Sequence, residues 1–129
     1  MLFRSPVFGV WAEEIDYLYE DQSNQAIPVA GNAAGLLGEY RLHTVCDVVH
    51  AESARVLATY GKDFYAGRPV ITQNQFGSGS AWYVAAMSDQ SLLDDVYGHI
   101  VKSLSIPTAW PTKLPEGVTA RSQIGRAHV

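Results

Sequence analysis

Only one stretch of this chain has helical periodicity, and it follows four or five segments with the composition of β-strands. From residue 89 to about residue 104, apolar side chains recur every three or four positions, as they do along one face of a helix. One helix covers only one face of a sheet. We therefore predict an α/β unit whose other sheet face meets chain outside this sequence or a partner subunit. The predicted stripe consists of Leu93, Val96, Tyr97, Ile100, Val101 and Leu104.

The ends of this helix are marked by residues that begin or stop helices. Ser88 or Asp89 is placed to cap the first turn, and Pro107 and Pro111 cannot continue the last one. Gly98 in the middle costs about 1 kcal/mol relative to alanine. We expect either that a neighbouring chain packs closely against Gly98 or that the helix is weak.

The β-rich segments suggest a sheet that includes one clear hairpin. We predict strands over residues 7–18, 40–50 and 54–60, with an irregular loop over residues 20–38 that holds at most a short strand at 26–29. Residues 69–76 and 81–88 flank a Gly-Ser-Gly-Ser connection, which is typical of a β-hairpin. Alternation in the 40–50 strand predicts two faces, one with His43, Val45, Asp47 and Val49 and one with Thr44, Cys46, Val48 and His50.

Composition limits the classes of protein to which the chain can belong. Its 129 residues fit one domain, and 47% hydrophobic with 17% charged residues is globular rather than disordered. A net charge of −4 argues against nucleic-acid binding, and no apolar run reaches the roughly 18 residues of a membrane span. A single cysteine rules out an internal disulfide framework. We expect a soluble, cytoplasmic protein.

The two ends can be encoded by one short DNA element read in opposite directions. That element resembles a sequencing-library adapter, and it accounts for residues 1–5 and for residues 124–127 with the first base of His128. We expect residues 1–5 and 124–129 to be adapter-derived. The natural sequence would then run from about residue 6 to residue 122 or 123 and belong to something longer.

Cys46 and His50 are the first chemical candidates. At four residues apart they would meet on a helix, as a thiol nucleophile with its base or as a metal pair. On a strand they lie about 13 Å apart, at roughly 3.3 Å per residue. We therefore interpret Cys46 as a buried structural residue.

Three further patterns have a structural interpretation that we prefer. Glu13, Glu14 and Asp16 suggest paired glycosidase carboxylates, but neighbouring strand residues point to opposite faces, which favours a solvated or inter-subunit role. The Gly-rich 77–80 segment resembles a phosphate loop, yet it opens a strand rather than a helix. His43 and His99 have no companions at ligand spacing. We predict no catalytic, cofactor-binding or metal-binding residues in this chain.

Several segments together resemble a known family. They are residues 8–16 (FGVWAEEID), 47–52 (DVVHAE), 58–70 (ATYGKDFYAGRPV) and 74–84 (NQFGSGSAWYV). Their order resembles the middle, trimerisation domain of the family 42 glycoside hydrolases, the bacterial β-galactosidases. The resemblance covers about residues 7–104, and residues 114–118 (LPEGV) look like the entry to the family's C-terminal β domain.

The resemblance implies a larger enzyme that hydrolyses terminal non-reducing β-D-galactosides. Its TIM-barrel domain would bind the substrate and supply two glutamates of a retaining mechanism, and neither Glu13 nor Glu14 matches them. Residues 6–106 would be the C-terminal part of a flavodoxin-like, class I glutamine amidotransferase-like domain. That domain would have a mixed sheet, a hairpin and one C-terminal amphipathic helix. Residues 107–123 would be a linker and the start of the β domain. The segment would serve homotrimer formation and be inactive alone, without cofactors.

Two other functions remain open at this point. A non-catalytic carbohydrate-binding or scaffold module would use exposed Trp11, Trp82 and Tyr83. An amidotransferase-like enzyme would use Cys46, although this cysteine lacks the flanking glycines of a nucleophile elbow.

Overall fold

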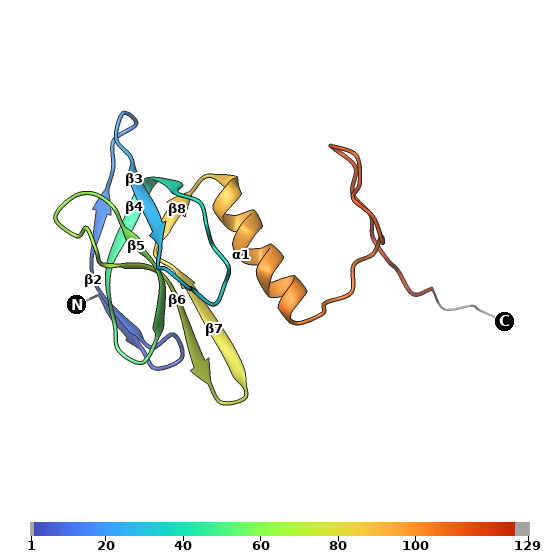
Figure 1. Cartoon of the computed structure of the whole chain (residues 1–129), viewed down its shortest axis with the longest axis horizontal. Coiled ribbons are helices and arrows are strands. Elements are labelled where there is room, and N and C mark those ends of the chain that lie inside the picture. Colours follow the sequence, from blue (N-terminus) through green and yellow to red (C-terminus); the bar gives the residue numbers. More distant parts are fainter. Residues whose placement is uncertain (1, 126–129) are drawn as a thin grey trace.

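The computed structural model describes residues 2–125, and it is a mostly antiparallel sheet followed by one helix (Figure 1). The predicted strands over 7–18, 40–50, 54–60 and 69–76 are confirmed, and the predicted 81–88 strand is interrupted at Ala85. A short strand also forms in the predicted irregular loop. In chain order the elements are β1 (Phe3–Ser5), β2 (Val10–Tyr17), β3 (Asn24–Pro28), β4 (Tyr40–Ala51), β5 (Arg55–Tyr60), β6 (Pro69–Phe76), β7 (Gly79–Val84), β8 (Ala86–Ser88) and α1 (Gln90–Ser103).

The resemblance led us to expect a mixed sheet, and this expectation is wrong for the described chain. Every strand pairing within residues 2–125 is antiparallel. Antiparallel strands need only short connections, and the β6–β7 turn has two residues, Gly77 and Ser78. Gly77 has φ +59°, which suits the first central position of a type II′ hairpin turn.

The long strand β4 has partners on both of its edges. Leu42 pairs with Asn24 of β3 on one side and with Ser88 of β8 on the other. From β3 the pairing continues through β5 and β6 to β7. Because β7 runs into β8 after a single residue, the series of strands returns to β4 and the sheet closes on itself.

Ala85, between β7 and β8, ties the closing strands together. Its N–H donates to the Val70 carbonyl at 2.8 Å, and its carbonyl accepts from the Asp47 N–H at 2.6 Å. We had expected one sheet face to need chain from elsewhere. Closure instead lets the sheet bury its inner face against itself, and the largest fully buried side chains include Tyr60, Tyr65, Leu42, Leu57, Ile71, Val48, Val49 and Val70.

The predicted alternation of faces along residues 40–50 is wrong at Thr44. Its φ is +63°, and the pairing between β4 and β8 shifts register between His43 and Cys46. The irregularity turns Thr44 outward by itself, because Tyr40 and Leu42 before it and Cys46 and Val48 after it are all buried. Thr44 is therefore exposed, although Cys46, two positions on, is fully buried.

The helix is where we predicted it, but its buried face differs from the predicted stripe. Asp89 is the N-cap residue, although its side chain makes no capping hydrogen bond. Leu92 and Val96 are buried, whereas Tyr97 and Leu104 of the predicted stripe are 62% and 67% exposed. The closed sheet already has its own core, so α1 covers it with a narrow face and leaves a second apolar stripe outside.

The segments at the two ends have different structures. Residues 3–5, expected to be adapter-derived, form β1 and pair with β2. After α1 the described chain has no helix or strand up to residue 125, and it extends away from the sheet (Figure 1). Residues 1 and 126–129 of the predicted adapter-derived ends lie outside the described part. No helix among the described residues is long and apolar enough to cross a membrane.

Candidate interaction surface

Cys46, the predicted structural cysteine, lies in the core and is fully buried. Burial raises the pKa of its thiol to about 11, because the thiolate would lose its hydration. A thiol nucleophile needs the opposite shift. Cys46 is therefore unsuited to the amidotransferase-like role considered above, and the interpretation as a structural residue is confirmed.

His50 contacts groups from other segments rather than Cys46. Its Nε2 lies 2.7 Å from Glu13 Oε2, and Arg68 Nη1 lies 2.6 Å from its Nδ1. Trp11 stacks on the imidazole at 3.9 Å with the rings 10° from parallel. The hydrogen bond from His50 is the main reason why the pKa of the Glu13 carboxyl is lowered. We had not predicted Arg68, because nothing in the sequence links residue 68 to residues 13 and 50.

Glu13 reaches His50 because of a β-bulge. Ala12 pairs with Val49 and Glu14 with Val48, so Glu13 is the extra residue and has no residue opposite it in the strand pairing with β4. A bulge of this kind redirects a side chain. The cluster joins β2, β4 and the β5–β6 connection. It contains one carboxylate, that of Glu13, and so lacks the carboxylate pair across a pocket that glycoside hydrolysis uses.

The remaining predicted candidates also have structural surroundings. Residues 77 and 78 form the turn of the predicted hairpin, and Gly79 and Ser80 belong to β7. His43 Nε2 lies 3.5 Å from Asp89, and the His99 ring lies 5.7 Å from that of Trp82. Within residues 2–125, no three His, Cys, Asp or Glu side chains are placed to hold a metal ion.

Tyrosine–aspartate hydrogen bonds engage the candidate Asp16 and also Asp47 of β4. Tyr65 donates to Asp16 and Tyr83 to Asp47, at 2.6 Å and 2.7 Å. Burial, with the neighbouring carboxylate, raises the pKa of both phenols, so they stay protonated donors. Asp16 and Asp47 therefore help to hold the strands together.

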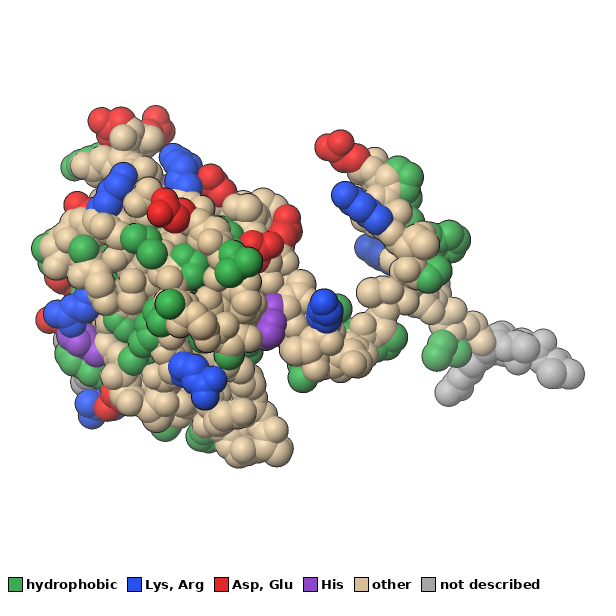
Figure 2. All heavy atoms as spheres, in the orientation of Figure 1, with side chains coloured by type: hydrophobic (Ala, Val, Ile, Leu, Met, Phe, Trp, Pro, Cys, Tyr) green, Lys and Arg blue, Asp and Glu red, His purple; other side chains and the backbone are tan. Residues whose placement is uncertain are grey.

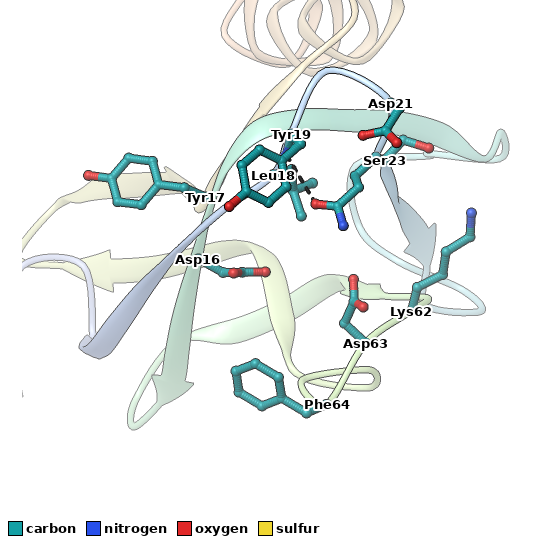
Figure 3. A pocket seen from close by; sticks show the side chains of 10 residues that line it. Asp16, Tyr17, Leu18, Tyr19, Asp21, Ser23, Lys62, Asp63 and Phe64 are labelled. Atoms are coloured by element: carbon teal, nitrogen blue, oxygen red, sulfur yellow. Dashed lines mark hydrogen bonds between the residues drawn. The ribbon is translucent and has the colours of Figure 1, made fainter.

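A separate group of aromatic side chains is exposed at one side of the sheet. Tyr17, Tyr19 and Phe64 are 69%, 78% and 75% exposed and surround an open pocket of about 560 Å³ (Figure 3). Tyr17 ends β2, Tyr19 lies in the β2–β3 loop and Phe64 in the β5–β6 connection. We call this the aromatic pocket; its other lining residues are Asp16, Leu18, Asp21, Gln22, Ser23, Lys62 and Asp63.

The two segments that form the aromatic pocket are fixed by a buried asparagine. Asn24 is fully buried; its amide donates to the Lys62 carbonyl at 3.1 Å and to Asp63 at 3.3 Å. Its side-chain oxygen accepts from the Lys62 N–H at 2.9 Å. The exposed rings are thus carried by a backbone that is already positioned, which lowers the ordering cost of binding.

The aromatic pocket is acidic and is distinct from the aromatics named in the sequence analysis. Three carboxylates, those of Asp16, Asp21 and Asp63, line it against one lysine. The β2–β3 loop contains two adjacent acidic residues, Glu20 and Asp21, and acidic side chains lie at its tip (Figure 2). Trp11, Trp82 and Tyr83 are only partly exposed, and the last two pack against the core. Their burial counts against the carbohydrate-binding alternative in the form proposed above.

Comparison with known proteins gives consistent matches over most of the chain. The model of the β-galactosidase trimerisation domain matches residues 5–107. β-Galactosidase Pbg of Clostridium perfringens is 43% identical over 115 residues, which are 89% of this chain and 17% of that protein. β-Galactosidase BgaP of Planococcus sp. is 39% identical over 92% of this chain and 17% of that protein.

Solved structures show the same relationship. The β-galactosidase of Rahnella sp. R3 matches with a TM-score of 0.84 and 51% identity, over 88% of this chain and 17% of that one. The Bacillus circulans β-galactosidase matches with a TM-score of 0.72 and 40% identity, over 77% of this chain and 14% of that one. The chain thus spans about one sixth of the length of these relatives.

Proposed function

We propose that this chain, which belongs to the β-galactosidase trimerisation-domain family, serves the association of subunits and does not itself cleave bonds. The family match over residues 5–107 is the observation that carries this proposal. The candidate residues support it, because Cys46 is a buried, protonated thiol and Glu13 is engaged with His50. The exposed rings of the aromatic pocket provide a surface suited to protein contact.

The complete protein would be a homotrimeric, cytoplasmic β-galactosidase that hydrolyses terminal non-reducing β-D-galactosides. Substrate binding and cleavage would be performed by a TIM-barrel domain outside this sequence. Residues 6–106 would belong to a flavodoxin-like domain, with parallel strands contributed by chain outside this sequence. Residues 107–123 would lead into a C-terminal β domain, and residues 1–5 and 124–129 would be adapter-derived.

Two measurements on the purified chain test the proposal. Light scattering coupled to size exclusion should show association to a trimer, and a chromogenic β-galactoside should not be hydrolysed. The β-galactosidase of Rahnella sp. R3 is the positive control for the assay. A chain that stays monomeric over the whole concentration series would contradict the association role, and turnover above the buffer blank would contradict the inactive role.

A further inference from the structure

We propose that the aromatic pocket of one copy receives the end of α1 and the following segment from a second copy, in a head-to-tail contact. This inference rests on the proposed function and adds which two surfaces meet. A closed three-membered ring is built from heterologous contacts, in which two different surfaces of the same chain pair. The chain must therefore carry a second surface that complements the first.

The second surface is the apolar stripe that α1 leaves uncovered. Tyr97 and Leu104 lie seven positions apart, so they share one helix face, and both are more than 60% exposed. The segment after α1 adds two further exposed apolar side chains, since Ile106 and Trp110 are 45% and 54% exposed. Large apolar side chains left exposed on neighbouring segments are typical of a surface that contacts another protein.

Charge favours pairing of these two surfaces with each other. Between Val96 and Pro115 the sequence has two lysines, Lys102 and Lys113, and no acidic residue. The aromatic pocket has three aspartates and one lysine. Opposite charges around an apolar contact steer the partners together and penalise pairing of a surface with its own kind. We call the second surface, made of Tyr97, Lys102, Leu104, Ile106, Trp110 and Lys113, the basic apolar surface.

The two surfaces lie on different elements, as a head-to-tail contact requires. The aromatic pocket is formed by the end of β2, the β2–β3 loop and the β5–β6 connection. The basic apolar surface lies on α1 and the segment after it, away from that loop (Figure 1). One copy can therefore use both surfaces at once, each toward a different neighbour.

Two double variants, one for each surface, test the contact. Y19S/F64S removes two rings from the aromatic pocket, and Y97S/L104S removes two side chains from the basic apolar surface. Large aromatic and apolar side chains at the centre of an interface carry most of its binding energy, so each variant should raise the dissociation constant at least about thirtyfold. Leu37→Ser, at a position that is 95% exposed on another loop, is the control and should associate like the unmodified chain.

Mixing the variants distinguishes a head-to-tail contact from a symmetric one. Each double variant keeps one intact surface, so an equimolar mixture should form heterodimers in light scattering, whereas each variant alone stays monomeric. Circular dichroism of each variant checks that the fold is retained. If either double variant still forms trimers, or if the mixture stays monomeric, the assignment of the surfaces is wrong. An unmodified chain that never associates would instead contradict the proposed function itself.

Discussion

The closed sheet buries Leu57 and Ile71 completely, whereas α1 and the segment after it leave Tyr97, Leu104 and Trp110 more than half exposed. Both regions are rich in apolar residues. In the sheet these residues contact one another, because the strands return to β4 and enclose them. In the C-terminal region they lie along a helix with a single packed face. Apolar content alone therefore does not tell which region is stable by itself and which needs a partner.

The largest expected difference between the regions is in core truncation. Leu57→Ala should lower the free energy of unfolding by about 2–5 kcal/mol, because it removes a fully buried side chain and leaves a cavity. Leu104→Ala should change it by less than about 0.5 kcal/mol in the monomer, because that side chain is 67% exposed. Urea unfolding at a concentration where the chain is monomeric measures both. If both substitutions lowered the free energy of unfolding by similar amounts, the proposed difference between the closed sheet and the C-terminal region would be wrong.

A smaller effect is expected at the turn before β2. Gly9 has φ +65°, and a Cβ there would lie 2.4 Å from Ser53 Oγ and 2.7 Å from the Asn74 side chain. Gly9→Ala should therefore destabilise the chain by about 2 kcal/mol, from backbone strain and displacement of that contact. Chemical denaturation is the measurement. An unchanged free energy of unfolding would mean that the side chains of Ser53 and Asn74 can move aside without loss of stability.

Alkaline unfolding sharpens the comparison through Tyr40, whose hydroxyl donates to Asp95 of α1 at 2.6 Å. Burial, followed by that hydrogen bond, raises the pKa of Tyr40 to about 12 from 10.0. A raised pKa means that the folded state holds the proton more tightly, so this contribution is present below pH 10 and is lost between pH 10 and about 12. Tyr40→Phe should therefore weaken the fall in urea midpoint over that range. If Tyr40→Phe leaves the pH dependence of the urea midpoint unchanged, ionisation of other tyrosines causes the alkaline loss of stability.

The smallest expected change is a gain in stability. Apart from its chain neighbours and the nearby backbone of α1, a Cβ placed on Gly98 meets no described atom within 4 Å, so Gly98→Ala should stabilise the monomer by up to about 1 kcal/mol through helix propensity. Thermal unfolding followed by circular dichroism would detect it. If the same variant weakens association, a neighbouring copy approaches α1 at this glycine, which is one of the two explanations raised by the sequence.

The strands and the helix could be predicted from the sequence because their signals are local. The Gly-rich hairpin and the apolar spacing from Leu93 to Leu104 each depend on fewer than twenty neighbouring residues. The closure of the sheet could not be predicted, since it depends on Leu42 pairing with both Asn24 and Ser88. The outward turn of Thr44 could not be predicted for a related reason, because its positive φ has no signal in the neighbouring sequence.

The aromatic pocket was only partly accessible to sequence reasoning. Asp16 belongs to the acidic group that the sequence shows, but Tyr19 and Phe64 lie 45 positions apart and line one pocket in a fold where Asn24 joins their loops. Trp11 and Trp82, which the carbohydrate-binding alternative requires to be exposed, are partly buried because they lie on strands that pack against other elements. Exposure of an aromatic ring depends on which loops come together, and this requires the tertiary structure.

Closure of the sheet also imposes an order on synthesis at the ribosome. One edge of β4 can pair with β3 and β2 as soon as residue 51 has emerged, but its other edge stays open until β8 emerges. Through that interval the nascent chain carries an unpaired strand edge, which is prone to pair with other chains. The three-residue β8 is therefore the element whose emergence allows the second edge of β4 to pair.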